Sequence, residues 1–275
     1  MIATDPSTLL SVQGLTQRFG GIIANNNISF DVKRHSITAL IGPNGAGKTT
    51  VFNCITGFYP ATSGNIFLFL DKNNKPIAIS ELLNRPFTGG AHQVARAGIA
   101  RTFQNIRLFQ DMTVLENLLI AQHLRLDKNL FRGMLAHQHF EKKEEEGIEY
   151  AMEWLKTLRM ESHANRLAGE LPYGYQRQLE IARAMCTHPK LICLDEPAAG
   201  LNPAETEQLS ELIYLLRDQH CVTVLLIEHD MGLVMEISDH IIVLDHGVVI
   251  ADGSPQDVQK NPQVIAAYLG TEATT

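Results

Sequence analysis

The sequence predicts an α/β fold in which a mainly parallel β-sheet is interrupted by a helical insertion. An apolar, β-branched run at residues 36–41 leads directly into a glycine-rich loop and a helical segment. Strand-like runs return late in the chain, at residues 191–194, 222–227 and 240–244. Helical patterns fill residues 113–185 between these two parts. Strands that are apolar on both faces and alternate with helices are typical of parallel sheets.

The first half of the chain is expected to begin with strands and then enter the glycine-rich loop. Residues 10–19 and 28–32 have the composition of short strands. Helical residues follow from Lys48 to Gly57, where a glycine suits the left-handed position just after a helix. Residues 71–92 are rich in Asn, Pro and Gly, which predicts a turn-rich excursion at the surface.

The helical insertion is predicted to begin with a capping box. Thr113 and Glu116 have the spacing at which each side chain can bond the other's backbone N–H, just before a periodic apolar run. A helix is therefore expected over residues 113–126. Two further helices and a hairpin are predicted at residues 141–160, 204–217 and 240–251.

Length and charge limit the classes of function. A chain of 275 residues can form one large domain or a domain with a subdomain. Its net charge of -7 argues against a nucleic-acid partner, because a phosphate backbone needs clustered Lys and Arg. No apolar run approaches the roughly 18 residues of a membrane span, and the N-terminal residues lack a signal-peptide pattern. We expect a cytosolic chain.

The cysteines and a histidine pair predict neither disulfides nor a metal site. No two cysteines form a C-x-x-C pair, and each lies in apolar or helical sequence, so reduced and buried thiols are expected. His137 and His139 lack the further ligands of a metal site and are expected in a solvated loop. The cysteines are Cys54, Cys186, Cys193 and Cys221.

The glycine-rich loop fits the phosphate-binding pattern G-x-x-x-x-G-K-[ST]. Gly45 and Gly47 permit backbone angles that let successive N–H groups converge on phosphate oxygens, and the following helix N-terminus favours an anion. Lys48 is expected to reach the β and γ phosphates, and the Thr49 hydroxyl to ligate Mg²⁺. The alternative is a glycine-rich turn with a chance lysine. The loop comprises Gly42, Pro43, Asn44, Gly45, Ala46, Gly47, Lys48, Thr49 and Thr50.

Two adjacent carboxylates, Asp195 and Glu196, end the apolar run at residues 191–194. Such a pair at the end of a buried strand is costly unless metal, water or hydrogen bonds satisfy it. Successive strand residues point to opposite sides, so the two carboxylates should have separate roles. Asp195 fits a carboxylate beside Mg²⁺ and Glu196 a base that orients and polarises the attacking water. The alternative is a helix-capping pair.

The order of these motifs resembles that of the ATPase subunits of ABC transporters. The phosphate-binding loop is followed by Gln104 in RTFQ, by a polar turn at Leu171, by LDEP at Leu194 and by His229 in IEHD. The resemblance implies ATP and Mg²⁺ as cofactors. It also implies a P-loop NTPase fold with a RecA-like core, an antiparallel β subdomain and a helical subdomain.

The resemblance assigns further roles. Gln104 would contact Mg²⁺ or its water and act as a hinge, His229 would hydrogen-bond the γ-phosphate, and Phe19 would stack on adenine. Taken alone, Gln104 is compatible with a loop residue, His229 with a strand end and Phe19 with a core position. The whole chain, 1–275, would be one ATPase domain with a core of about 1–103 and 186–275 and a helical subdomain of about 104–185.

In ABC ATPases the polar turn, called the signature, contacts ATP that is bound to the opposite subunit, so two ATPs hold a head-to-tail dimer. This chain departs from the common LSGGQ because a proline replaces the serine and removes its hydroxyl. Asn202 also stands where the family often has Asp. We hypothesise that the opposite ATP site is weakened but kept, since a helix N-terminus still presents backbone donors. The signature residues are Leu171, Pro172, Tyr173, Gly174 and Tyr175.

Within the family the chain resembles the LivG branch, the ATP-binding subunits of branched-chain amino acid importers. That branch implies two permease subunits, a second ATPase that is LivF-like or a second copy, and an external solute-binding protein. The chain would then sit on the inner face of the membrane through the permeases. The segments that carry the resemblance are 98–109, 112–123, 194–203, 225–239 and 261–270.

Rival functions remain open at this stage. Amide or urea import and lipopolysaccharide export use similar subunits, and a non-transport ABC ATPase or a regulatory ATP-binding module are further alternatives. A single P-loop and the short stretch between Gln104 and Leu171 count against repair or translation ATPases. Residues 107–109 (Arg107, Leu108 and Phe109) are candidates for touching the permeases, or for a core contact of the helical subdomain.

Overall fold

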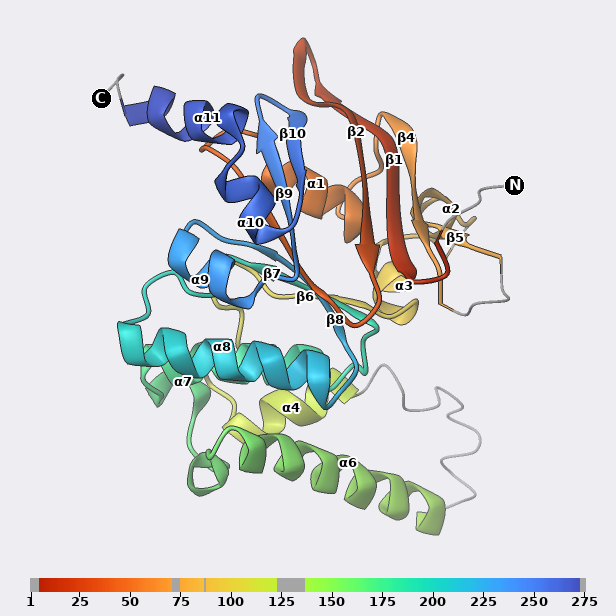
Figure 1. The fold of residues 1–275 in the computed structure, drawn as a ribbon. Coiled ribbons are helices and arrows are strands. Elements are labelled where there is room, and N and C mark those ends of the chain that lie inside the picture. The colour runs from red at the N-terminus through yellow and green to blue at the C-terminus, as the bar shows by residue number, and fades with distance from the viewer. Residues whose placement is uncertain (1–4, 71–74, 87, 123–136, 273–275) are drawn as a thin grey trace. The chain divides into compact units, whose positions relative to one another are not determined.

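The computed structural model describes residues 5–70, 75–86, 88–122 and 137–272 (Figure 1). The chain divides into two compact units. One, here called the core unit, comprises Met1–Gln104 and Lys190–Thr275, and the other, the helical unit, comprises Asn105–Pro189. Within these described ranges no helix is both long and apolar enough to cross a bilayer. The assignment of the whole chain to one ATPase domain stays a prediction.

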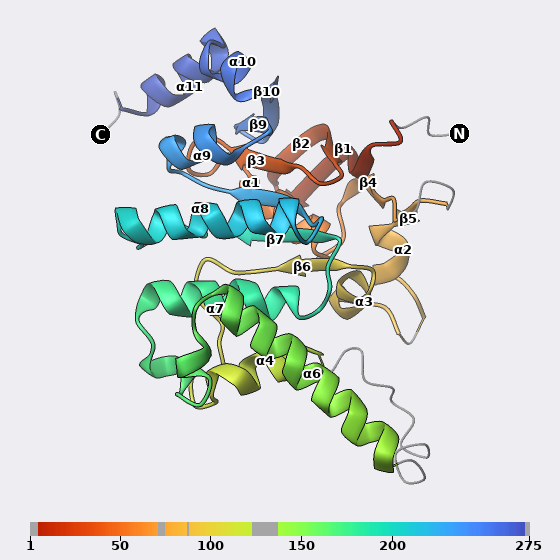
Figure 2. The same cartoon turned by 60° about the horizontal axis from the view of Figure 1, so that its bottom comes forward.

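The core unit is built on a six-stranded sheet with the order β10-β9-β3-β8-β7-β6 (Figure 2). All neighbouring pairs are parallel except β10 with β9. Every residue of β3, β7 and β8 is buried, as their apolar composition predicts for strands covered on both faces. The strands are β3 (Ile37–Ile41), β6 (Ile99–Arg101), β7 (Leu191–Asp195), β8 (Thr223–Ile227), β9 (His240–Asp245) and β10 (Val248–Gly253).

A second sheet of the core unit is antiparallel and has the order β2-β1-β4-β5. Its long strands alternate between buried and exposed residues, and shifts of register interrupt the pairing of β1 with β2. Its apolar face joins the same hydrophobic core as β3 and β8. The strands are β1 (Thr8–Phe19), β2 (Ile22–Lys33), β4 (Ser63–Leu68) and β5 (Ile77–Ala78).

Of the helices of the core unit, α1 directly follows the glycine-rich loop. The helix α8 begins with a full capping box and lies along the six-stranded sheet beside α9 (Figure 2). The last two helices, α10 and α11, follow the β9–β10 hairpin. The helices are α1 (Lys48–Ile55), α2 (Ile79–Leu83), α3 (Ala91–Arg96), α8 (Pro203–Asp218), α9 (Met231–Ile237), α10 (Pro255–Gln259) and α11 (Pro262–Glu272).

In the described part of the helical unit, three helices pack around a small core of their own. The indole of Trp154 is almost fully buried in it, and the fully buried Asn117 bonds the backbone of Phe109 and Thr113. Its helices are α4 (Val114–Gln122), α6 (His137–Thr157) and α7 (Tyr173–Met185), with short 3₁₀ turns at η1 (Glu161–His163) and η2 (Ala168–Glu170).

Most predicted elements are confirmed within these ranges. The capping box is present, because the backbone N–H of Thr113 donates to Glu116 at 2.8 Å and that of Glu116 donates to the Thr113 hydroxyl at 3.1 Å. Gly57 has the left-handed φ of 74° expected after α1. The helix predicted to end at residue 160 stops at Thr157, since Arg159 turns left-handed with φ 56°. Residues 123–126 of the first predicted insertion helix lie outside the described ranges.

Three expectations were wrong and some elements were missed. Residues 71–92 were expected as a turn-rich surface excursion, but they hold β5, α2 and the start of α3, and Ile79 and Leu82 are buried. Residues 71–74 and 87 of this stretch are not described. The elements β4, β6, α9, α10 and α11 were not predicted. Cys221 is exposed, although the other three cysteines are buried as expected and their burial raises each thiol pKa to about 12. His137 and His139 belong to the first turn of α6 and not to a loop as expected, while their side chains lie outside the described set.

Candidate nucleotide-binding site

The predicted phosphate-binding and carboxylate residues gather at one edge of the six-stranded sheet. In the register of the sheet, Ile227 at the end of β8 pairs with Leu40 of β3 on one side and Asp195 of β7 on the other. The glycine-rich loop follows β3, Glu196 follows β7, and His229 lies two residues beyond β8. Carboxyl ends of adjacent parallel strands form the usual crevice for a ligand in open α/β sheets.

Residues of β2 and of the β9–β10 turn contact the backbone of the glycine-rich loop. Gly47 has φ 95°, and a Cβ there would lie 2.3 Å from the side-chain nitrogen of Asn25. That nitrogen instead donates to the Gly47 carbonyl at 3.2 Å. The backbone N–H of Gly247, in the β9–β10 turn, donates to the Ala46 carbonyl at 3.2 Å. Glycine at position 47 is thus required both by its backbone angle and by the close approach of β2.

The first residue of the loop also contacts the C-terminal helix. The backbone N–H of Gly42 donates a hydrogen bond to the hydroxyl of Tyr268 in α11. A Cβ at Gly42 would lie 2.0 Å from the Leu244 carbonyl oxygen, so only glycine fits here. Burial raises the pKa of Tyr268, which keeps its phenol protonated. A segment more than 200 positions away in the chain therefore touches the loop at its start.

The Lys48 side chain is folded back onto its own loop. Its Nζ donates to the carbonyl oxygens of Gly42 at 2.7 Å and Pro43 at 2.9 Å. Burial lowers the pKa of Lys48, while the negative charges of Glu196 and Asp195 act to raise it. Among the other loop residues, Asn44, Gly45 and Thr49 are exposed, Gly47 and Thr50 are half-buried and Ala46 is buried.

Three predicted site residues meet at Glu196. Its Oε1 lies 2.7 Å from Nε2 of His229, and its Oε2 accepts a hydrogen bond from the Gln104 amide at 2.7 Å. The backbone of Glu196 has a positive φ of 47°, which is uncommon for a side chain of this size, and its N–H donates to the Ile227 carbonyl at 2.9 Å. Strained positions of this kind cluster at functional sites. The structure thus brings together residues 92 and 33 positions apart.

Asp195 forms an ion pair with Arg101, which was not among the predicted site residues. Arg101 ends β6 and donates to Oδ2 of Asp195 at 2.8 Å. It also donates to Asn53 at 2.6 Å and to Thr56 at 3.1 Å, both in or just after α1. The arginine stands in the RTFQ segment that contains Gln104, so its position was visible, but its partners were not.

Glu228 is a second missed residue. Its Oε1 accepts from the backbone N–H of Ala198 at 2.7 Å, and its Oε2 accepts from that of His229 at 3.0 Å. Burial raises the pKa of Glu228, helped by the nearby charge of Glu196, against the lowering effect of these backbone donors. This carboxyl therefore joins the segment after β7 to the segment after β8. The sequence did contain a sign of this residue, because an acidic side chain directly follows the apolar run that forms β8.

Phe19, the predicted adenine contact, ends β1 and leaves 47% of its surface exposed. Its ring meets Tyr59 edge-on with centroids 5.4 Å apart. It is not a core residue, so an aromatic face is available at the surface of the core unit. Such a face can stack on a base.

The signature residues lie at the start of α7 in the helical unit. Pro172 is the N-cap residue of α7, and Leu171 before it is buried. Tyr173 and Tyr175 are exposed to 43% and 37%. The Tyr173 hydroxyl accepts from Arg177 at 3.3 Å, and the Tyr175 ring meets His163 edge-on. Gly174 is buried in the first turn.

Behind the signature, a buried ion pair reaches the residues that follow Gln104. Arg177 donates to Glu180 at 2.8 Å, and both side chains are almost fully buried. The other oxygen of Glu180 accepts from the Arg107 backbone N–H at 3.0 Å. Burial raises the pKa of Glu180. Phe109 is 49% exposed and lies against Arg183, whereas Leu108 is half-buried.

Asn202 has a local structural role in this chain. Its side chain accepts from the Glu205 backbone N–H at 3.0 Å, and Glu205 accepts from the Asn202 N–H at 2.9 Å. This capping box starts α8, directly after the segment that contains Asp195 and Glu196. Aspartate could cap equally well, so capping alone does not explain the departure from the family's usual residue.

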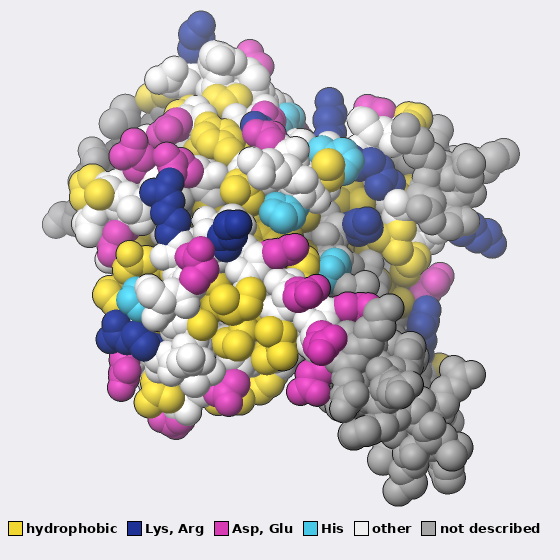
Figure 3. Space-filling view, turned by 90° about the horizontal axis from the view of Figure 1, so that it is seen from below, with side chains coloured by type: hydrophobic (Ala, Val, Ile, Leu, Met, Phe, Trp, Pro, Cys, Tyr) yellow, Lys and Arg dark blue, Asp and Glu magenta, His cyan; other side chains and the backbone are white. Residues whose placement is uncertain are grey.

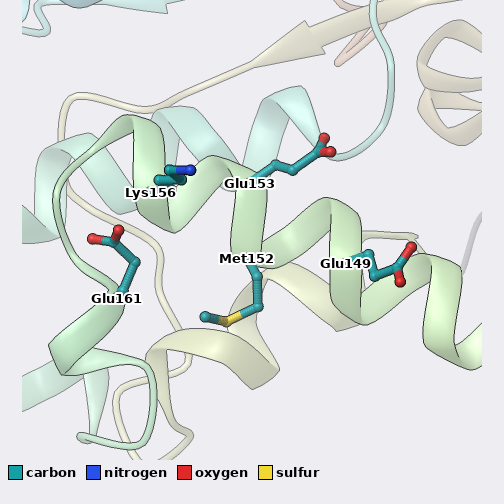
Figure 4. A pocket seen from close by; sticks show the side chains of 5 residues that line it. All are labelled: Glu149, Met152, Glu153, Lys156 and Glu161. Atoms are coloured by element: carbon teal, nitrogen blue, oxygen red, sulfur yellow. The ribbon is translucent and has the colours of Figure 1, made fainter.

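The surface shows two further features of the helical unit. Hydrophobic side chains gather in the middle of one face with acidic side chains beside them (Figure 3). Among the described residues of the helical unit, large apolar side chains are exposed at Phe109, Ile120, Ile148, Leu167, Tyr173 and Tyr175. A shallow hollow of about 360 Å³ on α6 and η1 is lined by Glu149, Met152, Glu153, Lys156 and Glu161 (Figure 4). It contains none of the predicted nucleotide-binding residues.

The P-loop at the carboxyl edge of a parallel sheet, with an adjacent carboxylate pair and a strand-end histidine, defines an ATPase of the P-loop class. Comparison with known proteins identifies the family within this class. A family model described as ABC transporter matches residues 25–199, and one described as branched-chain amino acid ATP-binding cassette transporter matches residues 248–274. The chain belongs to the ABC transporter ATP-binding proteins, in the branch that contains LivG and BraF.

Individual relatives match over almost their full length. The chain is 52% identical over 262 residues to the branched-chain amino acid transport ATP-binding protein BraF of Pseudomonas aeruginosa, covering 95% of this chain and 98% of that protein. It is 51% identical over 262 residues to LivG of Escherichia coli, with the same coverage. A solved ATP-binding cassette of an ABC transporter in its ADP conformation is 33% identical, with a TM-score of 0.78 and coverage of 96% and 99%.

Proposed function

We propose that this chain is the ATP-hydrolysing subunit of an importer for branched-chain or other hydrophobic amino acids. The observation that carries the proposal is the match to BraF and LivG over nearly the whole chain, including the C-terminal segment of residues 248–274. ATP binding follows from membership of the family of ATP-binding cassettes. The nucleotide-site geometry supports hydrolysis as the source of power.

The loop residues would hold the phosphates of ATP. Helix α1 begins at Lys48 within this loop, and the backbone N–H groups at its N-terminus favour an anion. Lys48 would turn from the carbonyl oxygens of Gly42 and Pro43 to the phosphates, since an ion pair is stronger than two bonds to neutral acceptors. Phe19 would stack on adenine from the end of β1.

The donor set suits Mg²⁺. The Thr49 hydroxyl, the Asp195 carboxylate and the Gln104 amide offer hard oxygen ligands, and Mg²⁺ usually combines one or two protein ligands with water and substrate phosphate. Asp195 is buried at a strand end and Arg101 bonds its Oδ2, so its Oδ1 would be the oxygen that faces the metal or a metal-bound water. When bound, the metal would neutralise charge on the β and γ phosphates.

Glu196 would act as the general base for the attacking water. Gln104 and His229 each bond one of its two oxygens. These two bonds fix the orientation of the carboxylate plane, as a positioned base requires. His229 would exchange this bond for one to the γ-phosphate. Glu228 would hold the backbone of His229 in place.

The signature residues Leu171 to Tyr175 would contact ATP on a second ATPase subunit, either LivF-like or another copy of this chain. ATP that binds the closed pair more tightly than the open pair would drive closure, and hydrolysis would release it. Two permease subunits would take up this motion, with Arg107, Leu108 and Phe109 among the candidate contacts. An external solute-binding protein would deliver the amino acid, and this chain would sit on the cytoplasmic side.

The test is to express the chain with the genes beside it and purify the assembly through this subunit. We expect two permeases, a second ATPase and a solute-binding protein whose bound ligand is leucine, isoleucine or valine. Amides or urea in the binding protein would replace the proposed substrate, and a lipid-export membrane pair would replace import. Absence of ATP hydrolysis in the complete assembly would favour a regulatory ATP-binding module instead.

A further inference from the structure

Arg101 joins three parts of the core unit through one guanidinium group. From the end of β6 it bonds Asp195 at the end of β7 at 2.8 Å. Its other terminal nitrogen bonds Asn53 at 2.6 Å and Thr56 at 3.1 Å. A guanidinium has its donors in a rigid planar fork, so these bonds fix their partners relative to one another.

The surroundings hold this guanidinium in place. Its centre lies 5.0 Å from the ring centroid of Phe103, 5.9 Å from Phe52 and 6.0 Å from Phe58. Only 9% of the side chain is exposed, as is only 8% of that of Asp195. In such a desolvated site an ion pair is screened little by solvent, and its geometry is set by the protein.

The position of α1 depends on the same contacts. This helix has eight residues and carries Thr49 in its first turn, while Asn53 lies in its last turn and Thr56 just after it. A helix this short moves as one piece, so an anchor at its end also fixes its beginning. Thr49 and Asp195 are the two groups for which the proposed function requires a set separation around Mg²⁺.

We infer that Arg101 is a positioning residue that fixes Asp195 relative to α1 and thereby sets the spacing of the metal-ligating groups. The inference rests on the proposed roles of Thr49 and Asp195 toward Mg²⁺. It concerns Arg101 itself, to which neither the P-loop nor the carboxylate pattern assigns a task. A purely structural ion pair would affect stability without affecting the response to Mg²⁺.

The test compares binding of a non-hydrolysable ATP analogue with and without Mg²⁺. We expect Arg101→Gln to bind the analogue in EDTA within about twofold of the wild type, while the Mg²⁺ concentration for half-maximal enhancement rises about 10-fold. Arg101→Lys should fall in between, because an ammonium keeps the charge but cannot hold all three partners. Asn53→Ala should give a smaller rise, since it removes one anchor and keeps the ion pair.

The control is Arg96→Gln, which removes an exposed arginine of α3 in the same unit and should leave the Mg²⁺ response unchanged. A Mg²⁺ midpoint that is unchanged in folded Arg101→Gln would overturn the inference. Should that variant not fold, Arg101→Lys and Asn53→Ala decide in the same way. Absence of any Mg²⁺ enhancement in the wild type would instead contradict the proposed metal roles of Thr49 and Asp195.

Discussion

The two parts of the chain that the family assigns to ATP are built differently. In the core unit, site side chains bond one another: Glu196 holds Gln104 and His229 through its two oxygens. In the helical unit, the Tyr173 hydroxyl bonds Arg177 and the Tyr175 ring contacts His163, while both side chains expose a large share of their surface. The proposed hydrolytic base is thus held by other side chains of the same chain, whereas Tyr173 and Tyr175 of the signature leave much of their surface uncovered.

The strongest test of this contrast is Glu196→Gln. Loss of the general base should lower ATP turnover of the assembled transporter by about 10²- to 10⁴-fold. ATP binding should persist, because Gln can keep one bond to each neighbour, and the closed ATP-bound dimer should accumulate. Steady-state ATPase assays and size-exclusion chromatography with ATP measure the two effects. Glu207→Gln, at an exposed position of α8, should be neutral; undiminished turnover in Glu196→Gln would remove Glu196 from the base role.

Phe19→Ala should weaken ATP binding by about 5- to 150-fold, which is the range for loss of one aromatic stack on a base. The effect should appear in the isolated subunit, since Phe19 belongs to the core unit's own site. Equilibrium binding of ATP and of triphosphate without a base separates stacking from phosphate contacts. Ile22→Ala, at a neighbouring residue that is 71% exposed, is the matched control. Equal affinity in Phe19→Ala and wild type would show that adenine lies elsewhere.

Pro172→Ser tests the other side of the contrast and should have a smaller effect. The restored hydroxyl should tighten ATP binding in the assembled pair by about 2- to 5-fold, the value of one added hydrogen bond. The isolated subunit should bind ATP as before, because the signature contacts the partner's nucleotide. Titrations of both preparations provide the comparison. If affinity and turnover of the assembled complex stay unchanged, the proline does not weaken the opposite site.

The smallest expected effect concerns pH. Burial raises the pKa of Glu228 above its unfolded value, so the folded chain holds this proton more tightly than the unfolded chain. Its contribution to stability is complete below the unfolded pKa of Glu and declines as pH rises to the raised folded value. Glu228→Gln cannot titrate at this position. The melting temperature of the wild type should therefore fall relative to that of Glu228→Gln as pH rises through this range.

The corresponding measurement is thermal unfolding of both chains from about pH 4 to about pH 8. Only the slope of the difference is diagnostic, because an amide in place of a buried carboxylate also changes the bonds to Ala198 and His229. The exposed Glu207→Gln serves again as the reference. A difference that does not depend on pH would mean that Glu228 keeps its ordinary pKa in the folded chain.

The sequence was informative where a motif depends on neighbouring residues. The glycine pattern of the P-loop, the capping box at Thr113 and the strand that ends in Asp195 each occupy one short segment, and each lies where the pattern indicates. Strands β4 and β6 were missed, since the first begins with polar residues and glycine and the second has only three residues. Their strand form comes from pairing with distant partners.

The supporting residues of the site were missed for the same reason. The partners of Arg101 come from two segments, the end of α1 and the end of β7, which are brought to β6 only by the sheet order and the position of α1. Glu228 can be identified only once the segments after β7 and β8 are known to be neighbours. Groups that perform chemistry follow local patterns, whereas groups that hold them follow the tertiary fold.

The hydrogen bond between Tyr268 and Gly42 has a practical consequence for protein engineering. An affinity tag or fluorescent fusion joined behind α11 would pull on the helix that touches the first residue of the phosphate-binding loop. We therefore expect ATP affinities measured on C-terminally tagged material to depend on the tag and its linker. A fusion at an exposed turn remote from this helix would avoid that influence.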